Sequence, residues 1–402
     1  MSKKIISLLK YNKENLLEKG KKAIYEDRID EALEIFEKLY RIDSQDVSII
    51  YNLAAIYIEK GDTNRSEELL LESHQKDENH LFTLIGLANL IFYKTENLKK
   101  AITYLDIALK EHDKSVDLYV SYANLYMIDG QYNSSLEFYK KAFDLEPKNE
   151  TVKSGLSMVY NFIGKNHLKK HEFLNAMNRF KDSVKLNENW ISPHLNIIRT
   201  LSYAGNMKRA FQIVQQLKDK VDNISLDYVI VDKNLWQEEI THTLLMIKLE
   251  ESKLFFRTGE KRKALNILKK IYRINSEFPS VGYLIALILL DFNELLDANK
   301  YIKAELNNYN SIKAKTLRYI INEKLNKASS WKGIHLNILK KETSDVYVLY
   351  DSAMLLKKYG YDIQSDDLLK YAKSLNPVKL NKLLNEIDVD LIDTMDLKDD
   401  LS

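Results

Sequence analysis

The chain has 402 residues, 45% of them hydrophobic, and a formal net charge of +2, so it can build an extended hydrophobic core. It has no cysteine, which excludes disulfide bonds, thiolate nucleophiles and cysteine-ligated zinc. Glycine (11) and proline (4) are scarce, as expected if nearly all of the chain is helical.

The N-terminal residues do not resemble an export signal. The apolar run over residues 5–9 is short, and Lys10 and Lys13 interrupt it. The most apolar stretch, residues 281–290, is much shorter than the roughly 20 residues needed to span a bilayer. It fits a buried helix covered on both sides by neighbours. We therefore expect no membrane span and a cytoplasmic protein.

Small residues recur along the chain, mostly at intervals of 34 or 35 residues, and the first four have a bulky apolar residue four positions later. Two intervals are longer, 41 and 54 residues. A period of this length is typical of helix-turn-helix repeats stacked into an array. The series comprises Ala32, Ser66, Ala101, Ser135, Ala176, Ala210, Ala264 and Ala298.

One repeat unit is clearest over residues 116–149. Apolar residues at i, i+3, i+4 and i+7 predict a first helix. Gly130 ends this helix, because glycine readily adopts the left-handed conformation that a helix stop needs. Pro147 ends a second apolar helix. The two apolar faces comprise Tyr119, Tyr122, Ala123 and Tyr126, then Ser135, Leu136, Tyr139, Ala142 and Phe143.

This unit resembles the tetratricopeptide repeat, which has small, glycine, aromatic and proline residues at fixed positions. The resemblance covers most of the chain in about ten units, with one degenerate unit around Trp331. It implies an all-α fold, a right-handed superhelical α-solenoid of stacked antiparallel helix pairs. The matching residues in this unit are Ala123, Gly130, Tyr132, Ser135, Tyr139, Ala142 and Pro147.

The two longer intervals suggest where the array is divided. The 41-residue interval predicts roughly two extra helical turns between Glu150 and Lys170. The 54-residue interval leaves an excess in a segment rich in β-branched residues, which is either an irregular loop, an extra helix or a docking hinge. We therefore expect an N-terminal repeat block over 1–219, an irregular connection or extra helix over 220–238, and a C-terminal block over 239–379. An acidic tail or capping helix would follow over 380–402.

The acidic tail has two interpretations. Between Glu386 and Asp400, seven acidic residues accompany a single lysine, and apolar residues are interleaved with them. The segment could cover the last hydrophobic face of the array, as solenoids require. It could also dock a partner, or lie in a basic groove of this same chain.

Motifs that carry chemistry are few. His167 and His171 are four apart on a predicted helix, but the run lacks the glutamate of an HExxH motif and contains two lysines. We therefore predict a surface pair and no metal site. No glycine-rich phosphate loop and no nucleophile–base arrangement stands out in the sequence. We expect no enzymatic activity, no cofactor and no metal.

The resemblance implies that the first helices of successive units line a concave groove. An asparagine side chain both donates and accepts hydrogen bonds, so it can hold the backbone of an extended peptide. Only Asn52 fits the carboxylate clamp that some family members use for chaperone peptides, so that specificity is not expected. The predicted peptide-binding residues are Tyr51, Asn52, Ile85, Asn89, Val120, Asn124 and Asn196.

These observations favour a scaffold or adaptor that binds a protein or peptide in the groove. The alternative is a nucleic-acid (RNA) binding repeat protein, because the chain without its acidic tail carries about +8. No basic stripe interleaved with aromatic residues supports that alternative. A regulated enzyme subunit has no separate catalytic domain to support it. The partner and the oligomeric state stay open.

Overall fold

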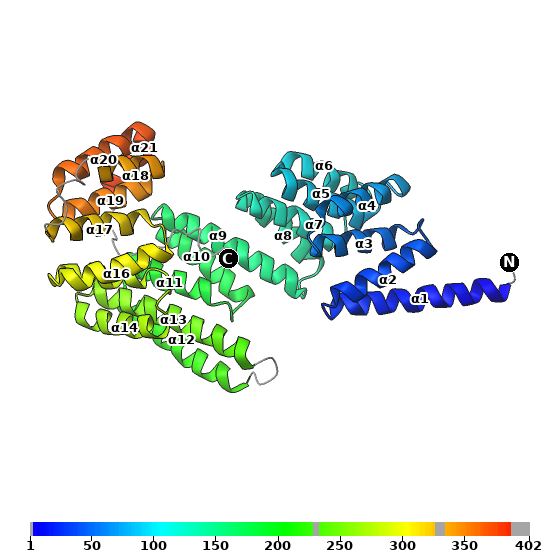
Figure 1. Cartoon of the computed structure of the whole chain (residues 1–402), viewed down its shortest axis with the longest axis horizontal. Coiled ribbons are helices and arrows are strands. Elements are labelled where there is room, and N and C mark those ends of the chain that lie inside the picture. The colour runs from blue at the N-terminus through cyan, green and yellow to red at the C-terminus, as the bar shows by residue number, and fades with distance from the viewer. Residues whose placement is uncertain (1–2, 228–232, 326–333, 387–402) are drawn as a thin grey trace. The chain divides into compact units, whose positions relative to one another are not determined.

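The computed structural model describes residues 3–227, 233–325 and 334–386. Within these ranges the chain forms 21 α-helices and no strand (Figure 1), which confirms the predicted all-α class. The N-terminal helices are α1 (Lys3–Tyr25), α2 (Ile29–Ile42), α3 (Val47–Glu59), α4 (Thr63–Lys76), α5 (Leu81–Thr95), α6 (Leu98–Leu109), α7 (Val116–Ile128), α8 (Tyr132–Leu145), α9 (Glu150–Lys169) and α10 (Phe173–Leu186). They are followed by α11 (Ile191–Tyr203), α12 (Met207–Asp227), α13 (Lys233–Arg257), α14 (Lys261–Ile274), α15 (Val281–Asp291), α16 (Leu295–Asn308), α17 (Ile312–Lys324), α18 (Ile334–Glu342), α19 (Val346–Lys358), α20 (Asp362–Leu375) and α21 (Pro377–Glu386).

Successive helices form antiparallel pairs (Figure 1), and short turns join the two helices of every pair except α17–α18, whose connection lies mostly outside the described residues. In the described part of the chain, ten pairs run from α1–α2 to α19–α20, and α21 follows the last pair. This agrees with the expected ten units. The turn inside a pair often contains a residue with positive φ, such as Gly130 at 79°, a conformation that costs glycine little.

The series of small residues lies where helices pack most closely. All eight, from Ala32 to Ala298, are fully buried, so no larger side chain fits between the helices at these points. The hydroxyl of Ser135 is also satisfied there, because it donates to the backbone oxygen of Ala123 at 2.7 Å. The period seen in the sequence is therefore the period of helix contacts.

The contacts divide the chain into two compact units. Unit 1 comprises residues 1–163 and 182–189, and unit 2 comprises residues 164–181 and 190–402. The division passes through the α9–α10 pair, and each unit is described by itself below. The domain boundaries expected near residues 220, 238 and 380 stay predictions.

Polar contacts tie each repeat to the next within a unit. In unit 1, Lys13 pairs with Asp46, which caps the start of α3, at 2.8 Å, and the Tyr40 hydroxyl donates to Glu72 at 2.8 Å. In unit 2, Lys340 pairs with Asp367 at 2.7 Å. The partners are 27 to 33 residues apart, close to one repeat, so these ties join neighbouring hairpins only.

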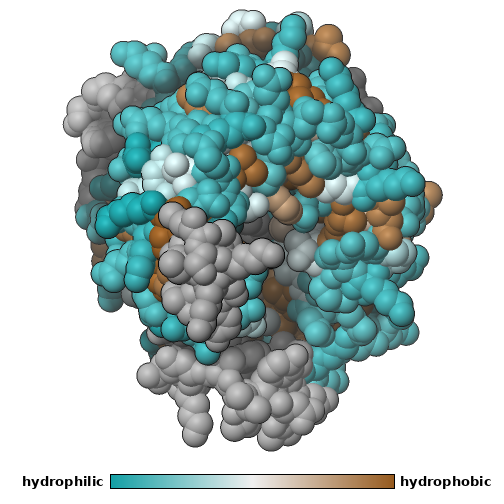
Figure 2. Space-filling view, turned by 90° about the vertical axis from the view of Figure 1, so that its right-hand side faces the viewer, coloured by the Kyte–Doolittle hydropathy of each residue, from teal (hydrophilic) through white to brown (hydrophobic). Residues whose placement is uncertain are grey.

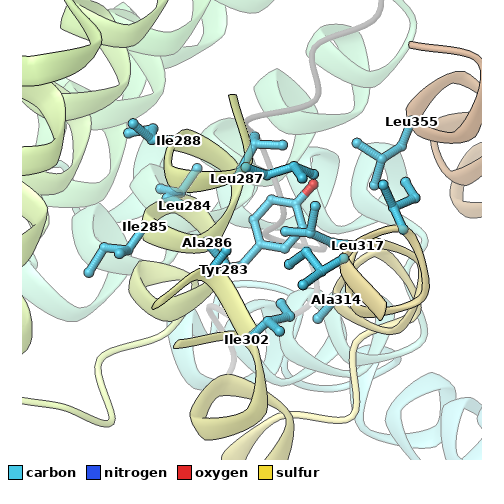
Figure 3. Close-up of a cluster of buried hydrophobic side chains, with 14 of the residues drawn as sticks. Tyr283, Leu284, Ile285, Ala286, Leu287, Ile288, Ile302, Ala314, Leu317 and Leu355 are labelled. Atoms are coloured by element: carbon cyan, nitrogen blue, oxygen red, sulfur yellow. The ribbon is translucent and has the colours of Figure 1, made fainter. Parts of the chain in front are cut away.

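Helix α15 forms the centre of the core of unit 2. Every residue from Val281 to Leu290 is buried, which confirms that this apolar stretch is a covered repeat helix. Figure 3 shows its side chains beside Ile302 of α16, Leu317 of α17 and Leu355 of α19. A helix that is apolar on all sides is stable here because other helices surround it. In the described part of the chain, no helix combines the length and apolar composition needed to cross a bilayer.

The two longer intervals of the series, 41 and 54 residues, contain helices that are longer than those in most other repeats. Helix α9 has 20 residues against 13 in α3 and α7, which confirms the two extra turns predicted after Glu150. Over 220–238, where a loop or an extra helix is expected, α12 continues to Asp227 and α13 begins at Lys233. Residues 228–232, Trp331 and residues 387–402 of the acidic tail lie outside the described residues.

Candidate peptide-binding surface

The first helices α3, α5 and α7 of unit 1 share one surface, and Tyr51 lies at its centre. Its ring centroid is 5.7 Å from that of Phe82 on α5. A Cβ atom placed on Gly86 of α5 would lie 3.5 Å from the Tyr51 ring. Burial raises the pKa of Tyr51, and the negative charge of Asp117 on α7 raises this pKa further. Side chains of α3 and α5 therefore meet at this ring, and Asp117 of α7 is near enough for its charge to act on the Tyr51 hydroxyl.

Residues four apart form a column along each of these helices, because such residues lie on the same helix face. The middle residues of two columns are Asn89 and Asn124. The last residues of the same columns, Tyr93 and Ile128, are 76% and 70% exposed. Phe82, at the start of α5, is 42% exposed. We call the following set the α3–α5–α7 surface: Tyr51, Ala55, Glu59, Phe82, Asn89, Tyr93, Asp117, Val120, Asn124 and Ile128. Ile85, which was predicted to bind peptide, is only 8% exposed and belongs to the core beneath this surface.

The two central asparagines have different hydrogen-bond partners. The oxygen of Asn124 accepts from the Tyr139 hydroxyl at 2.5 Å, and burial raises the pKa of this tyrosine to about 12. Tyr139 fits there because Gly155 leaves room for its ring. This contact orients Asn124, and among the described contacts its amide nitrogen donates to no protein group. Asn89 is exposed, and both ends of its amide are open to a ligand within the described contacts.

Asn52 and Asn196 lie in other environments. Asn52 donates to the backbone oxygen of Ser48 in its own helix at 2.7 Å, so its amide nitrogen is already engaged. Asn196 is fully buried in unit 2 and accepts from Arg199 at 3.0 Å. Asn196 therefore belongs to the packing of α11 and is not part of the α3–α5–α7 surface.

Asn196 belongs to a buried charged network. Arg199 donates twice to one carboxylate oxygen of Glu250 on α13, at 3.0 and 2.8 Å. Lys253 donates to the same oxygen at 3.1 Å. All four side chains are at least 95% buried, and the network joins α11 to α13. Asn196 was predicted to line the groove, but this network buries it between α11 and α13.

Three exposed apolar residues of the α3–α5–α7 surface were not predicted as peptide-binding residues. Phe82, Tyr93 and Ile128 lie on the same helix faces as the predicted asparagines. The sequence spacing could have indicated them. Tyr93 and Ile128 each lie four positions after a predicted asparagine, and Phe82 lies three positions before Ile85. On the face shown in Figure 2, hydrophilic residues predominate and hydrophobic ones lie in small groups. Exposed apolar side chains grouped on adjacent helices are typical of binding surfaces.

The histidine pair is not arranged as the sequence suggested. Helix α9 ends at Lys169, so His171 lies in the following turn, with a φ of 58°. The Nδ1 atom of His167 is 2.6 Å from a carboxylate oxygen of Glu172. Within the described ranges, no group of three or more His, Cys, Asp or Glu residues could hold a metal ion.

Comparisons with known proteins identify the repeat type. Two family models described as tetratricopeptide repeat match residues 23–85 and 116–149. A TPR repeat-containing protein of Methanocaldococcus jannaschii is 20% identical over 345 residues, which cover 83% of this chain and 55% of that relative. The chain thus spans about half the length of this curated relative.

Solved structures of tetratricopeptide repeat proteins are also similar. One from Parabacteroides merdae is 19% identical, with a TM-score of 0.46 over 69% of this chain and 99% of that chain. A thermophilic one from Thermus thermophilus is 18% identical, with a TM-score of 0.37 over 47% of this chain and 98% of that chain.

Proposed function

Because the chain is a tetratricopeptide-repeat protein, we propose that it is a non-catalytic scaffold that binds a protein or peptide on the α3–α5–α7 surface. The observation that supports this most directly is the exposure of Tyr93 and Ile128 beside Asn89 and Asn124. Apolar side chains and open amides alternate there on consecutive first helices. We also propose a cytoplasmic location, which is compatible with the absence of cysteine.

The spacing of the asparagines suits an extended peptide. Packed helices lie about 10 Å apart, and an extended chain rises roughly 3.3 Å per residue. The amides of Asn89 and Asn124 would therefore meet backbone groups about three residues apart in the ligand. Apolar ligand residues between them would contact Tyr93, Ile128 and Phe82. We therefore propose that the preferred ligand has apolar side chains at intervals of about three residues.

The same surface disfavours nucleic acid. Its charged members are Glu59 and Asp117, both acidic, and it presents no lysine or arginine in its three columns. Phosphate contacts supply most of the affinity of non-specific nucleic-acid binding. Peptide binding is therefore the function that this surface supports better.

A peptide-display selection on the whole protein tests the proposal. Random 12-residue peptides are selected, and the affinity of each binder is measured by fluorescence anisotropy. We expect at least tenfold weaker binding of the selected peptides to Asn89→Ala/Tyr93→Ala, since both side chains are exposed and their loss leaves the core intact. The matched control is Asn133→Ala, at an exposed asparagine on the second helix α8. Equal affinity of all selected peptides for the wild type and both variants would place the binding site elsewhere.

A further inference from the structure

Most of the first helices of unit 2 end in a charged residue. Helices α11, α13, α15, α17 and α19 have as their last residues Tyr203, Arg257, Asp291, Lys324 and Lys358. We call these five residues the C-terminal strip. Three of them are cations, so the strip differs from the α3–α5–α7 surface of unit 1, where the last residues of α5 and α7 are uncharged.

Contacts between helices join the residues of the strip in two groups. The guanidinium of Arg257 lies over the ring of Tyr203, 4.9 Å from its centroid. Asp291 lies 3.5 Å from the Nζ of Lys358 and accepts from the Tyr359 hydroxyl at 2.5 Å. The Nζ of Lys324 is 6.0 Å from the centroid of the Tyr359 ring. Residues from α15, α17 and α19 thus meet around one aromatic ring and one carboxylate.

Positive charge exceeds negative charge at this end of the helices. Lys261, the first residue of α14, also pairs with Asp291, at 2.6 Å. Asp291 therefore faces two lysines, and Lys324 is exposed beside them. Burial lowers the pKa of Lys358, the charge of Asp291 opposes this effect, and the charge of Lys261 adds to it. An additional carboxylate would relieve the repulsion between these lysines.

Helix α21 runs parallel to α19 and ends close to the strip. Near the beginnings of the two helices, the Nζ of Lys379 lies 4.0 Å from the centroid of the Tyr347 ring. Because α21 has 10 residues against 13 in α19, it ends about three residues, or roughly 5 Å, short of the level of Lys358. The chain therefore leaves α21, at Glu386, on the side of unit 2 that carries the strip.

The sequence that follows α21 is complementary in charge. Residues 387–402 contain six aspartates and one lysine. If extended, residues 387–402 would reach roughly 50 Å. Five helices about 10 Å apart span roughly 40 Å, so the segment is long enough to follow the whole strip.

We propose that the acidic segment 387–402 binds the C-terminal strip of its own chain, with its aspartates paired to Lys324, Lys358 and Arg257. An acidic partner would then reach the strip only by displacing this segment. The proposal is independent of the peptide-binding surface on α3, α5 and α7, which lies in the other unit.

Carbodiimide cross-linking of the full-length protein tests the proposal, because the reagent joins a carboxylate directly to a lysine amine. After digestion, mass spectrometry identifies the joined residues. The pair Lys340–Asp367, at 2.7 Å, is the internal positive control. We expect cross-links from the aspartates of 387–402 to Lys324 and Lys358. Cross-linking of Lys340 to Asp367 without any link from the segment to the strip would overturn the proposal.

Charge reversal at one exposed lysine tests the electrostatic basis. We expect Lys324→Glu to reduce the cross-links between the segment and Lys358 at least fivefold, and 0.5 M salt to reduce them similarly. The matched control is Lys300→Glu, at an exposed lysine on α16, which should change them by less than twofold. The triple variant Asp388→Asn/Asp390→Asn/Asp393→Asn alters the segment alone and should reduce the links from the unchanged Asp396, Asp399 and Asp400 to Lys358. Equal effects of Lys324→Glu and Lys300→Glu would overturn the proposal. In a mixture of isotopically light and heavy protein, links that join a light chain to a heavy one would also overturn it, because they would show that the segment binds another copy.

Discussion

The carboxylate of Glu305 on α16 accepts a hydrogen bond from the backbone nitrogen of Gly282 at the start of α15, at 3.1 Å. It also accepts from the backbone nitrogen of Ser280 at 3.0 Å. The first backbone nitrogens of a helix have no partner inside the helix. The second helix of this pair therefore caps the first with a buried side chain, and burial raises the pKa of Glu305.

The raised pKa of Glu305 predicts a pH dependence of stability. A carboxyl group with a higher pKa in the folded state stabilises the fold most when protonated, and this contribution is lost as pH rises through the folded-state pKa. We therefore expect the stability of the wild type, relative to Glu305→Gln, to fall as the pH rises from about 4. Urea unfolding of both proteins between pH 4 and 8 measures this difference. A difference that does not change with pH would contradict the prediction.

Gly282→Ala should destabilise unit 2. An added Cβ would lie 2.8 Å from the Glu305 carboxylate and 3.1 Å from the backbone oxygen of Tyr301. Relieving these contacts requires shifts in a packed helix pair, so we expect a loss of about 1–3 kcal/mol in the free energy of unfolding. The matched control is Gly86→Ala, also within a helix, where the nearest atom belongs to the flexible side chain of Leu70. Urea unfolding that gives equal losses for both variants would contradict the prediction.

Glu250→Ala should destabilise the protein strongly. Glu250 accepts hydrogen bonds from both Arg199 and Lys253, and removing it would leave two buried cations without their shared carboxylate. Breaking a buried ion pair in this way costs about 3–5 kcal/mol. The neighbouring Glu251→Ala is the control, because its partner Lys218 is partly exposed and such a pair contributes less than about 1 kcal/mol. Thermal and urea unfolding of the two variants should therefore differ clearly.

The expected boundary between repeat blocks can be tested by limited trypsin digestion. If the division over residues 220–238 is correct, the first cuts should fall at Lys220 or Lys233, and should leave one stable fragment on each side. The contacts instead divide the described chain through α9 and α10. Early cuts confined to residues 164–190 would therefore favour that division. Mass spectrometry of the early fragments distinguishes the two outcomes.

The sequence was sufficient to predict the helix pairs because their constraints are local. Ala32 and Ser135 are small where helices touch, Gly130 ends a helix, and the extra residues after Glu150 fit no other place than a longer helix. Each of these signals depends on residues within one repeat. Periodicity alone can reveal such constraints.

The environment of individual polar residues could not be predicted in the same way. Asn196 occupies a groove position by its register, yet Arg199 and Glu250 cover it, and these two are 51 residues apart. The longer α12 and α13 were also missed, because an excess of residues in a single sequence does not show which helix receives them. The exposure of Tyr93 likewise depends on the neighbouring helices.

The ties between neighbouring hairpins, such as Tyr40 with Glu72 and Lys340 with Asp367, have a mechanical consequence. Because these two ties each span only one repeat, contacts of this kind carry a force applied to the ends of a unit in series, whereas the tie between Asp291 and Tyr359 spans two repeats. Stretching would then extend each unit gradually, with small angular changes shared among many hairpins. A bound partner that bridges several hairpins would make the unit harder to extend.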